Sequence, residues 1–309
     1  MHSCNFCLLH FGLPRLEINP SNSLKACRKT LILVRLTSLG EISASDTLLA
    51  LEHAKNMSHT SSLPKPNPWS VRAVLNQLPD RPQENSSSPV PFFHYVERLK
   101  TEKREGWRRF GITKGESIAD HMYRMSIITM LAPPSLSSRL DLPRCTKMAL
   151  IHDMAEGLVG DLTPVDGVPK VEKNRREAET MDWISTGLLG KVHGGVAGQD
   201  IRAIWQEYED GETLESQFVH DVDKIELVLQ MVEYERAHHC AVDLSEFTWV
   251  AKRLCLPEMK AWAQEILEER EEMWKSKNME PREPQMAKIL REQQDEYYGK
   301  TNGTNGHQN

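Results

Sequence analysis

The amino-acid sequence predicts an all-α protein, with one globular helical bundle spanning about residues 91–277. Apolar residues recur in this range at the three- and four-residue spacing of amphipathic helices, and no alternating run of useful length indicates a β-strand. Polar segments rich in Ser, Pro, Asn or Gly border the range on both sides and cannot bury a core. We therefore expect a single domain between a disordered N-terminal extension and a disordered C-terminal tail.

The first three helices are expected between residues 92 and 159. Apolar residues at helical spacing from Phe92 to Leu99 give the first helix its buried side. Ser117 can cap the second helix, which Pro133 ends because proline donates no backbone hydrogen bond. The third helix is expected to run from Pro143 to about Val159, since proline is tolerated in the first helical turn.

Further helices are expected up to residue 277. Pro169 opens a fourth helix that ends near Gly187 or Gly190. A short charged helix near 283–298 is expected on the outside of the domain or in solvent. Four more helices are expected between the fourth helix and this charged one. The first is marked by Ile201, Ile204, Trp205 and Tyr208, and the others are expected at Leu214 to about His238, Ser245–Leu254 and Pro257–Lys277.

The sequence outside the bundle divides into three parts. Residues 1–56 are either an organelle-targeting segment, which their basic start suggests, or an extension ahead of a translation start at Met57. Residues 57–90 are rich in Pro and Ser and are expected to be a linker, in which residues 71–75 form one short helical turn or a docking segment. Residues 278–309 hold the charged helix and a polar tail.

The formal net charge of −6 and the cysteine pattern limit the classes of function. A mildly acidic chain argues against a nucleic-acid polymer as partner, because phosphate neutralisation requires a basic surface. No apolar run approaches the roughly 18 residues of a membrane span. Six scattered cysteines indicate a reducing compartment, and Cys4 with Cys7 forms a lone CxxC that is weak evidence for zinc. We expect a cytoplasmic protein, with a nuclear location as the alternative, or a mitochondrial one if residues 1–56 are translated.

The adjacent pair His152 and Asp153 is the strongest indication of chemistry. It follows a strongly apolar run, where a buried carboxylate is costly unless it is paired or binds a metal. His121 upstream and Asp223 downstream stand among apolar residues of two other predicted helices. A divalent cation shared by these four side chains removes the cost for all of them. A mixed nitrogen and oxygen site suits a metal that activates water.

Each of these residues also has a simpler interpretation. A lone histidine such as His121 on an apolar helix face is more often a core residue than a metal ligand, and Asp223 can pair with Lys224 or a nearby arginine. The combination favours the metal, because three helices each carry an ionisable group where packing would prefer none.

Two acidic residues follow the His-Asp pair. Glu156 lies one turn further on the same predicted helix face, where it can act as a base towards water or hold a second ion. Asp161 falls on a turn, either as a proton-transfer group or as a simple turn or helix N-cap residue. The cations that can hold phosphate, most of them expected on the surface, are Lys100, Lys103, Arg104, Arg108, Arg109, Arg124, Lys170 and Lys173.

Three segments occur in a recognisable order. They are Glu116–Arg124, His152–Pro164, and Asp223–Glu226 followed by Gln230 and Glu233–Glu235. Together they resemble the HD-domain superfamily, and more narrowly its 5′-deoxynucleotidase branch of the HD-domain-containing protein 2 type. The resemblance covers roughly residues 91–277, and its motifs are long and correctly separated.

The resemblance implies an all-helical, metal-dependent phosphohydrolase that cleaves deoxyribonucleoside 5′-monophosphates to deoxynucleoside and phosphate. It favours Asp223 over Asp221 as a ligand, because the family's ligand directly precedes Lys-Ile-Glu. It implies that Glu156 and Asp161 work on water and leaving group, or help to hold a second ion. The implied metal ligands are His121, His152, Asp153 and Asp223.

The resemblance also implies a phosphate contact, a metal type and a partner. The family uses an arginine just before a tryptophan; because Gly106 directly precedes Trp107, the nearest candidate is Arg104. Manganese, cobalt and magnesium are the candidate metals, and a homodimer is plausible by resemblance. Two alternatives stay open: an HD phosphohydrolase for a cyclic, triphosphate or signalling nucleotide, and a non-catalytic nucleotide-binding or protein-binding scaffold.

Overall fold

The computed structural model describes residues 69–281, and in this part of the chain the secondary structure is helical without a β-strand. Lys103 and Ser117 form an isolated β-bridge. The all-α prediction is confirmed. The helices up to residue 160 are α3 (Val71–Leu75), α4 (Val90–Thr101), α5 (Glu105–Arg108), α6 (Ile118–Met130), α7 (Pro134–Ser137), α8 (Leu142–Ala149) and α9 (Glu156–Val159). They are followed by η2 (Pro164–Asp166), α10 (Lys170–Trp183), η3 (Ile184–Leu188), η4 (Val192–Gly195), α11 (Val196–Asp210), α12 (Leu214–Ala237), η5 (Ser245–Arg253) and α13 (Pro257–Ser276).

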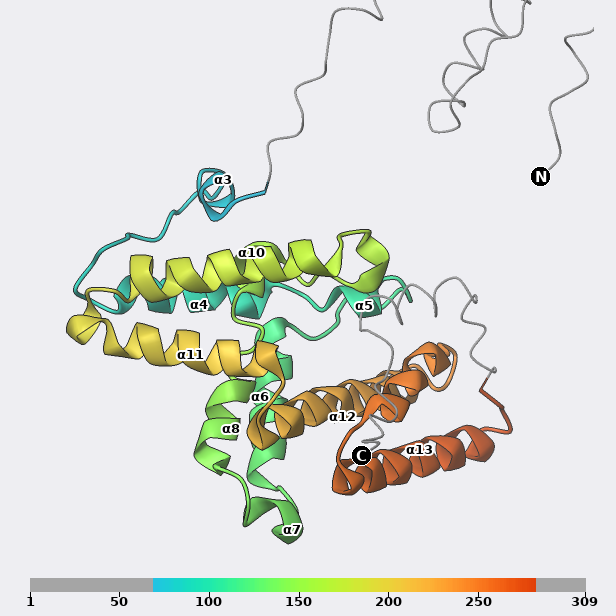
Figure 1. Ribbon diagram of the computed structural model, residues 1–309. Helices are drawn as coiled ribbons and strands as arrows, with labels where there is room; N and C mark the ends of the chain where they lie inside the picture. The colour runs from blue at the N-terminus through green and yellow to red at the C-terminus, as the bar shows by residue number, and fades with distance from the viewer. Residues whose placement is uncertain (1–68, 282–309) are drawn as a thin grey trace, which may run out of the picture. The chain divides into compact units, whose positions relative to one another are not determined.

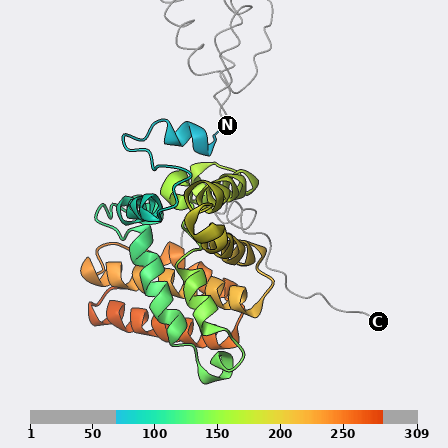
Figure 2. The same cartoon turned by 90° about the vertical axis from the view of Figure 1, so that its left-hand side faces the viewer.

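Helix α12 is central to the packing. Helices α6 and α8 lie side by side and both pack against α12, and α13 runs along α12 (Figures 1 and 2). Helices α4, α10 and α11 form a second group, which meets the first through contacts of α4 with α6 and of α11 with α8 and α12. The short helix α9 touches both α4 and α10. The predicted site residues on α6, α9 and α12 therefore lie where the two groups meet.

Helix α6 begins at the predicted cap. The Ser117 hydroxyl accepts a hydrogen bond from the Asp120 amide at 3.1 Å, and the Asp120 carboxylate accepts one from the Ser117 amide at 2.8 Å. This reciprocal arrangement satisfies two amides that the first helical turn leaves without a partner. The helix ends at Met130, ahead of Pro133 as expected. The cap fixes the register that places His121 one turn into the helix.

The predicted continuous helix from Pro143 to Val159 is wrong. Helix α8 ends at Ala149, residues 150–155 form tight turns, and α9 starts only at Glu156. The Nδ1 atom of His152 lies 3.0 Å from the Ala149 carbonyl, the acceptor that the next turn of a regular helix would use. The amide of Glu156 then bonds the Asp153 carbonyl at 3.0 Å, three residues back. The site histidine itself therefore accounts for part of the break.

The later predicted helices are found at the expected places. Pro169 caps α10, which passes at Ile184 into a single π-helical turn, and α12 ends directly before His238. Helix α11 carries the four apolar and aromatic markers, and α13 begins at Pro257. The segment from Ser245 forms a 3-10 helix that ends at Arg253.

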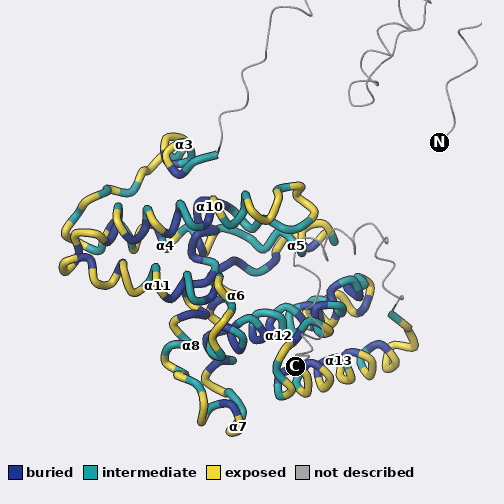
Figure 3. The backbone as a smooth tube through the Cα atoms, viewed as in Figure 1, coloured by how far each residue is buried: buried dark blue, intermediate teal, exposed yellow. Residues whose placement is uncertain are grey.

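Helix α13 is fastened to α12 through a buried ion pair. The fully buried carboxylate of Glu235 accepts hydrogen bonds from Arg270 Nε at 2.7 Å and Trp274 Nε1 at 2.8 Å. Figure 3 shows α13 with one buried side and one exposed side. A buried carboxylate needs such partners, because its desolvation is otherwise uncompensated. This ion pair holds α13 on α12, the helix that carries Asp223.

Helix α3 lies within the range 57–90 that was expected to be a linker. Its side chains Val71 and Leu75 are buried, and the Val71 amide donates to Glu179 Oε1 on α10 at 2.9 Å. The helical turn expected at residues 71–75 is therefore present and packs on the bundle. Packing thus starts before the expected boundary at residue 91.

Several expectations fall outside the described residues. They concern the targeting segment or extension at residues 1–56, the pair Cys4 and Cys7, and the charged helix near 283–298. Within residues 69–281, no helix combines the length and the apolar character that crossing a membrane requires.

Candidate metal centre

Four predicted ligands from three parts of the chain come together between α6, the turns after α8, and α12. His121 Nε2 lies 3.2 Å from Asp223 Oδ1 and 3.8 Å from Asp153 Oδ2. His152 Nε2 lies 3.2 Å from the same oxygen of Asp153. The ligand atoms of His121, His152 and Asp153 all lie within 4.8 Å of one another. The arrangement is compact enough for one ion to be shared.

The donor set fits a divalent cation. The Nε2 atoms of His121 and His152 are buried and have no hydrogen-bond partner among the described residues. A buried polar atom without a partner is rare and needs an explanation. With metal–ligand bonds of about 2.0–2.2 Å, neighbouring ligand atoms are roughly 3.0–3.4 Å apart. The observed separations lie close to this range, so the residues present fit a metal.

The orientation of both imidazoles is fixed from their far side. His152 Nδ1 faces the Ala149 carbonyl at 3.0 Å, and His121 Nδ1 faces Glu226 Oε2 at 2.7 Å. If each Nδ1 carries the proton, each Nε2 keeps its lone pair for a metal. The same contacts therefore direct both Nε2 atoms towards Asp153.

Asp221 and Asp223 have different roles, although both were candidates from sequence. Asp221 is buried and its carboxylate accepts hydrogen bonds from the amides of Cys255 at 2.9 Å and Leu256 at 2.7 Å, just ahead of α13. Asp223 instead faces His121, and its Oδ2 lies 3.5 Å from the Tyr208 hydroxyl. Two positions along a helix turn the side chain by more than half a turn. The geometry supports the choice of Asp223.

The charges around the centre favour ionised carboxylates. Burial alone would raise the pKa of Asp153 and of Asp223. The neighbouring histidines in their protonated form, together with Arg104, outweigh burial and hold both pKa values well below their usual range. Both groups are therefore available as anionic oxygen ligands at neutral pH.

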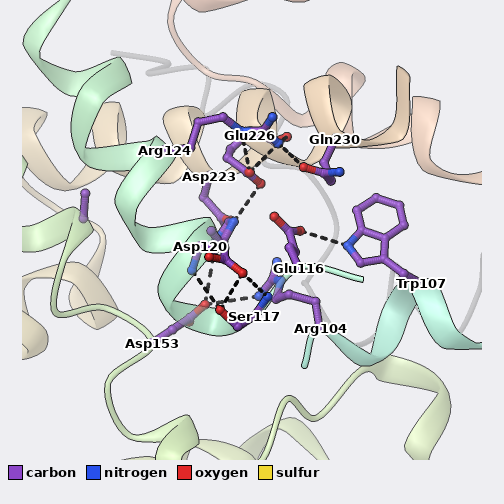
Figure 4. Close-up of polar contacts among 12 residues, drawn as sticks. Arg104, Trp107, Glu116, Ser117, Asp120, Arg124, Asp153, Asp223, Glu226 and Gln230 are labelled. Carbon is purple, nitrogen blue, oxygen red and sulfur yellow. Dashed lines mark hydrogen bonds and ion pairs between the residues drawn. The ribbon is translucent and has the colours of Figure 1, made fainter. Parts of the chain in front are cut away.

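Arg104 lies directly beside the candidate ligands (Figure 4). Its Nη1 is 3.1 Å from Asp153 Oδ2 and 3.9 Å from Asp161 Oδ1, and its side chain is largely buried. Trp107, in contrast, is buried and donates its Nε1–H to Glu116 at 2.9 Å. Arg104 is thus the residue of this segment whose charge faces the centre.

Asp161 lies at the rim, next to the first residue of the short helix α5. Its Oδ2 accepts a hydrogen bond at 2.7 Å from the amide of Glu105, and Glu105 is the first residue of α5. Gly160, with a φ of 79°, provides the backbone turn that leads into Asp161. Asp161 is therefore not the N-cap of the helix that follows it, where Thr163 stands, but accepts a hydrogen bond from an amide in a distant part of the chain. This hydrogen bond also holds the segment that carries Arg104.

Glu156 is a buried acidic residue with one carboxylate oxygen that is not engaged in a hydrogen bond among the described residues. It is 1% exposed, its Oε1 lies 3.5 Å from Lys173 Nζ, and its Oε2 has no hydrogen-bond partner among the described residues. Burial raises the pKa of Glu156 well above its usual range, and the nearby charges of Asp153 and Asp161 add to this effect. Glu156 therefore holds a proton more strongly than an ordinary carboxyl group.

Most other candidate phosphate cations pair with acidic residues other than the four expected metal ligands. Arg124 pairs with Glu226 at 2.6 Å, and Lys173 lies between Glu156 and Glu177. The other pairs are Lys100 with Glu97, Arg108 with Glu105, and Arg109 with Glu246.

Two residues next to the centre have no role assigned from sequence. Glu226 follows Asp223 by three positions, and this spacing on one helix face is a signal that the sequence does contain. Tyr208 comes from α11, and its approach to Asp223 depends on how α11 packs on α12. No local pattern around Tyr208 predicts it.

The chain belongs to the HD domain family, because residues 96–262 match that family. The 5′-deoxynucleotidase hdd1 of Schizosaccharomyces pombe is 46% identical over 192 residues, which cover 62% of this chain and 94% of that protein. The 5′-deoxynucleotidase YBR242W of Saccharomyces cerevisiae is 38% identical over 201 residues, covering 63% and 83%. The human 5′-deoxynucleotidase HDDC2 is 38% identical over 160 residues, covering 52% and 74%. The resemblance inferred from the sequence motifs is confirmed.

Proposed function

We propose that this chain is a metal-dependent 5′-deoxynucleotidase, which hydrolyses deoxyribonucleoside 5′-monophosphates to deoxynucleoside and phosphate. The observation that carries the proposal is the pair of buried, unpartnered Nε2 atoms facing the carboxylates of Asp153 and Asp223. The relatives named 5′-deoxynucleotidase support the substrate class, since the matched region covers up to 94% of such a protein.

Four side chains would hold the metal in this proposal: His121, His152, Asp153 and Asp223. A divalent ion there would supply Lewis-acid chemistry, which activates water and neutralises phosphate charge. Manganese, cobalt and magnesium stay the candidates, because two imidazoles with two carboxylates suit borderline to hard cations. A second ion held with the help of Glu156 and Asp161 also stays a prediction.

Arg104 would bind the phosphate of the substrate. Its guanidinium already lies 3.1 Å from Asp153, so a phosphate oxygen near the centre is within its reach. A guanidinium is permanently charged and offers several donors in one plane, which matches a phosphate group. The hydrogen bond from Glu105 to Asp161 supports this role, because it fixes the segment that carries Arg104.

Glu156 would manage the proton in the reaction. Because its pKa is raised, Glu156 can keep a proton near neutral pH and give it to the departing 5′ oxygen. Lys173, 3.5 Å away, can stabilise the carboxylate that remains. This geometry favours Glu156 over Asp161 for proton transfer, since an oxygen of Asp161 is engaged by the Glu105 amide.

The test is a hydrolysis panel with the purified full chain supplemented in turn with Mn²⁺, Co²⁺ and Mg²⁺. Paired deoxy- and ribonucleoside 5′-monophosphates, cyclic nucleotides and triphosphates are compared by released phosphate and pyrophosphate. We expect phosphate from the deoxy monophosphates, and less from their ribo partners. Preferred cleavage of another nucleotide class would leave an HD phosphohydrolase with a different substrate, and binding without hydrolysis would indicate a scaffold. The homodimer and the cellular compartment stay predictions.

A further inference from the structure

The imidazole of His121 and the carboxylate of Glu226 form a buried pair behind the candidate metal centre. His121 Nδ1 lies 2.7 Å from Glu226 Oε2, and both side chains are fully buried. Figure 4 shows Glu226 with its neighbours Arg124 and Gln230 beside Asp223. A carboxylate without contact to solvent is costly, so its partners and its purpose both need an explanation.

The two oxygens of Glu226 have separate partners. Oε1 accepts hydrogen bonds from Arg124 Nε at 2.8 Å and Arg124 Nη2 at 2.6 Å, while Oε2 faces His121. Arg124 Nη2 also lies 2.6 Å from Gln230 Oε1. The position of the carboxylate is therefore determined from one side by Arg124, and this leaves the other oxygen to orient the imidazole.

Two of the expected ligands, His121 and Asp223, each lie one turn before a member of the pair formed by Arg124 and Glu226. Asp223 and Glu226 are three positions apart on α12, and His121 and Arg124 are three positions apart on α6. Residues at this spacing share a helix face. When the faces of α6 and α12 meet, both ligands and both orienting groups are brought together in one step.

We propose that Glu226 is a positioning residue of the centre. It accepts the Nδ1–H of His121, fixes the tautomer with the lone pair on Nε2, and aims that lone pair at the site shared with Asp153 and Asp223. Arg124 holds Glu226 in place for this purpose. This inference rests on the proposed metal-dependent function.

The chemistry of the carboxylate leaves little choice of tautomer. An ionised carboxylate only accepts hydrogen bonds, so the His121 nitrogen that faces Glu226 has to carry a hydrogen. In the neutral imidazole, Nε2 then bears its lone pair 3.2 Å from an oxygen of Asp223. Two electron-rich atoms at that separation repel each other unless a metal ion or a second imidazole proton lies between them, and an Nε2 that carries a proton cannot bind a metal. Histidine ligands in metal sites commonly donate their other N–H to a carboxylate in this way.

The test compares Glu226→Gln and Glu226→Leu with a matched control, Glu233→Gln, on the exposed side of the same helix. The first readout is the Kd for Co²⁺, titrated into the metal-free full chain. The second is the long-range ¹H–¹⁵N spectrum of the Zn²⁺-loaded protein, which reports the protonated nitrogen of His121. The third is kcat and KM for a deoxyribonucleoside 5′-monophosphate.

We expect Glu226→Gln to weaken Co²⁺ binding by about 10- to 100-fold, the usual effect of losing such an orienting group. Glu226→Leu should weaken it further, because leucine has no acceptor, while Gln keeps one amide oxygen. At saturating metal, kcat should fall and KM should stay near the wild-type value. The wild-type spectrum should show Nδ1 protonated and Nε2 bound to Zn²⁺, and Glu233→Gln should match the wild type throughout.

Wild-type Co²⁺ affinity in folded Glu226→Gln would overturn the inference, as would a His121 bound to Zn²⁺ through Nδ1. If Glu226→Leu does not fold, the nearly isosteric Glu226→Gln decides. A wild-type chain that binds no Co²⁺ would remove the metal centre and this inference with it. A wild-type chain that binds Co²⁺ but releases no phosphate from nucleotides would contradict the proposed substrate, while the metal and NMR readouts would still decide the role of Glu226.

Discussion

The amide of Glu105 donates a hydrogen bond of 2.7 Å to the carboxylate of Asp161. This contact connects the turn after α9 to the first residue of α5, and Arg104 lies at the junction. Asp161 is 56 residues away from Glu105 in the sequence, so the contact exists only in the folded chain. It gives Asp161 a structural reason to be acidic that is independent of proton transfer.

Replacement of Asp153 tests the metal centre. We expect Asp153→Ala to lower phosphate release by about 1,000-fold or more, since losing roughly 4 kcal/mol of charge stabilisation has that effect on rate. Bound metal, measured by elemental analysis, should be lost while the helical circular dichroism persists. The control is Asp200→Ala, an exposed aspartate that pairs with Lys147. Unchanged activity in Asp153→Ala would rule out the proposed centre.

Glu156 and Asp161 are expected to respond differently to loss of charge. Glu156→Gln removes a transferable proton and should lower kcat by about 10²- to 10⁴-fold. Asp161→Asn keeps an oxygen that can accept from the Glu105 amide, so its activity should stay within about tenfold of the wild type. Steady-state kinetics with saturating metal measures both. The assignment of proton transfer to Glu156 would be wrong if the two effects were reversed.

Substitutions of Asp221 and Asp223 on α12 should affect two different properties, stability for Asp221 and metal binding for Asp223. Asp221→Ala removes the acceptor for the Cys255 and Leu256 amides and should cost about 1–2 kcal/mol of unfolding free energy, as lost helix caps do. Its Co²⁺ affinity should stay near the wild-type value. Asp223→Asn should show the opposite pattern, with weak Co²⁺ binding and a nearly unchanged melting temperature. Denaturant titration and Co²⁺ titration of both variants check this.

Residues 69–88 should contribute stability to the bundle. A chain that begins at residue 88 lacks the buried side chains of Val71 and Leu75, each of which contributes roughly 1.5–3 kcal/mol as an upper bound. It also lacks the hydrogen bond of Glu84 with Trp183. We expect a lower melting temperature than for a chain that begins at Trp69. Equal melting temperatures would mean that α3 does not stabilise the bundle.

His220 should make the protein sensitive to mild acid. Burial lowers the pKa of His220 to about 4, and the charge of nearby Lys224 acts in the same direction. As the pH falls below about 6.5, the unfolded chain takes up a proton that the folded chain refuses until about 4, so stability is lost across this window. The loss is on the order of 1–3 kcal/mol after allowance for partial solvent contact.

The comparison for this prediction is His220→Gln, which keeps a side-chain donor for the Tyr208 carbonyl. Urea unfolding between pH 7 and pH 4.5 should show a smaller loss of stability in this variant than in the wild type. His94→Gln, on an exposed position of α4, serves as the control. A wild-type loss that His220→Gln does not reduce would assign the acid sensitivity to other groups.

The fold was predictable because its signals are local. Ser117 marks a helix start through its side-chain hydroxyl and Pro169 through its fixed backbone, and the apolar spacing along α12 is visible without any partner. The continuous helix expected up to Val159 shows the limit of such signals. The apolar spacing continues past Ala149, but the Ala149 carbonyl is taken by the His152 side chain, and spacing alone cannot reveal that bond.

The candidate site divides in the same way. The types and the order of the four expected ligands can be read from the sequence. The fold brings these side chains together. Their role as metal ligands stays a prediction. The choice between Asp221 and Asp223 follows from helix periodicity only once the position of α13 is known. The same is true of Tyr208, which approaches Asp223 from α11.

The sequence by itself determined the helical class, most helix starts and the family, because the helix signals and each family motif depend on residues that are neighbours along the chain. Only the tertiary structure decided which further side chains surround the four expected ligands. It placed Glu226 behind His121, Arg104 beside Asp153, and Asp161 at the start of α5. Contacts between residues some 50 to 100 positions apart depend on how whole helices pack, and that is fixed by the combined burial of many side chains rather than by any local pattern.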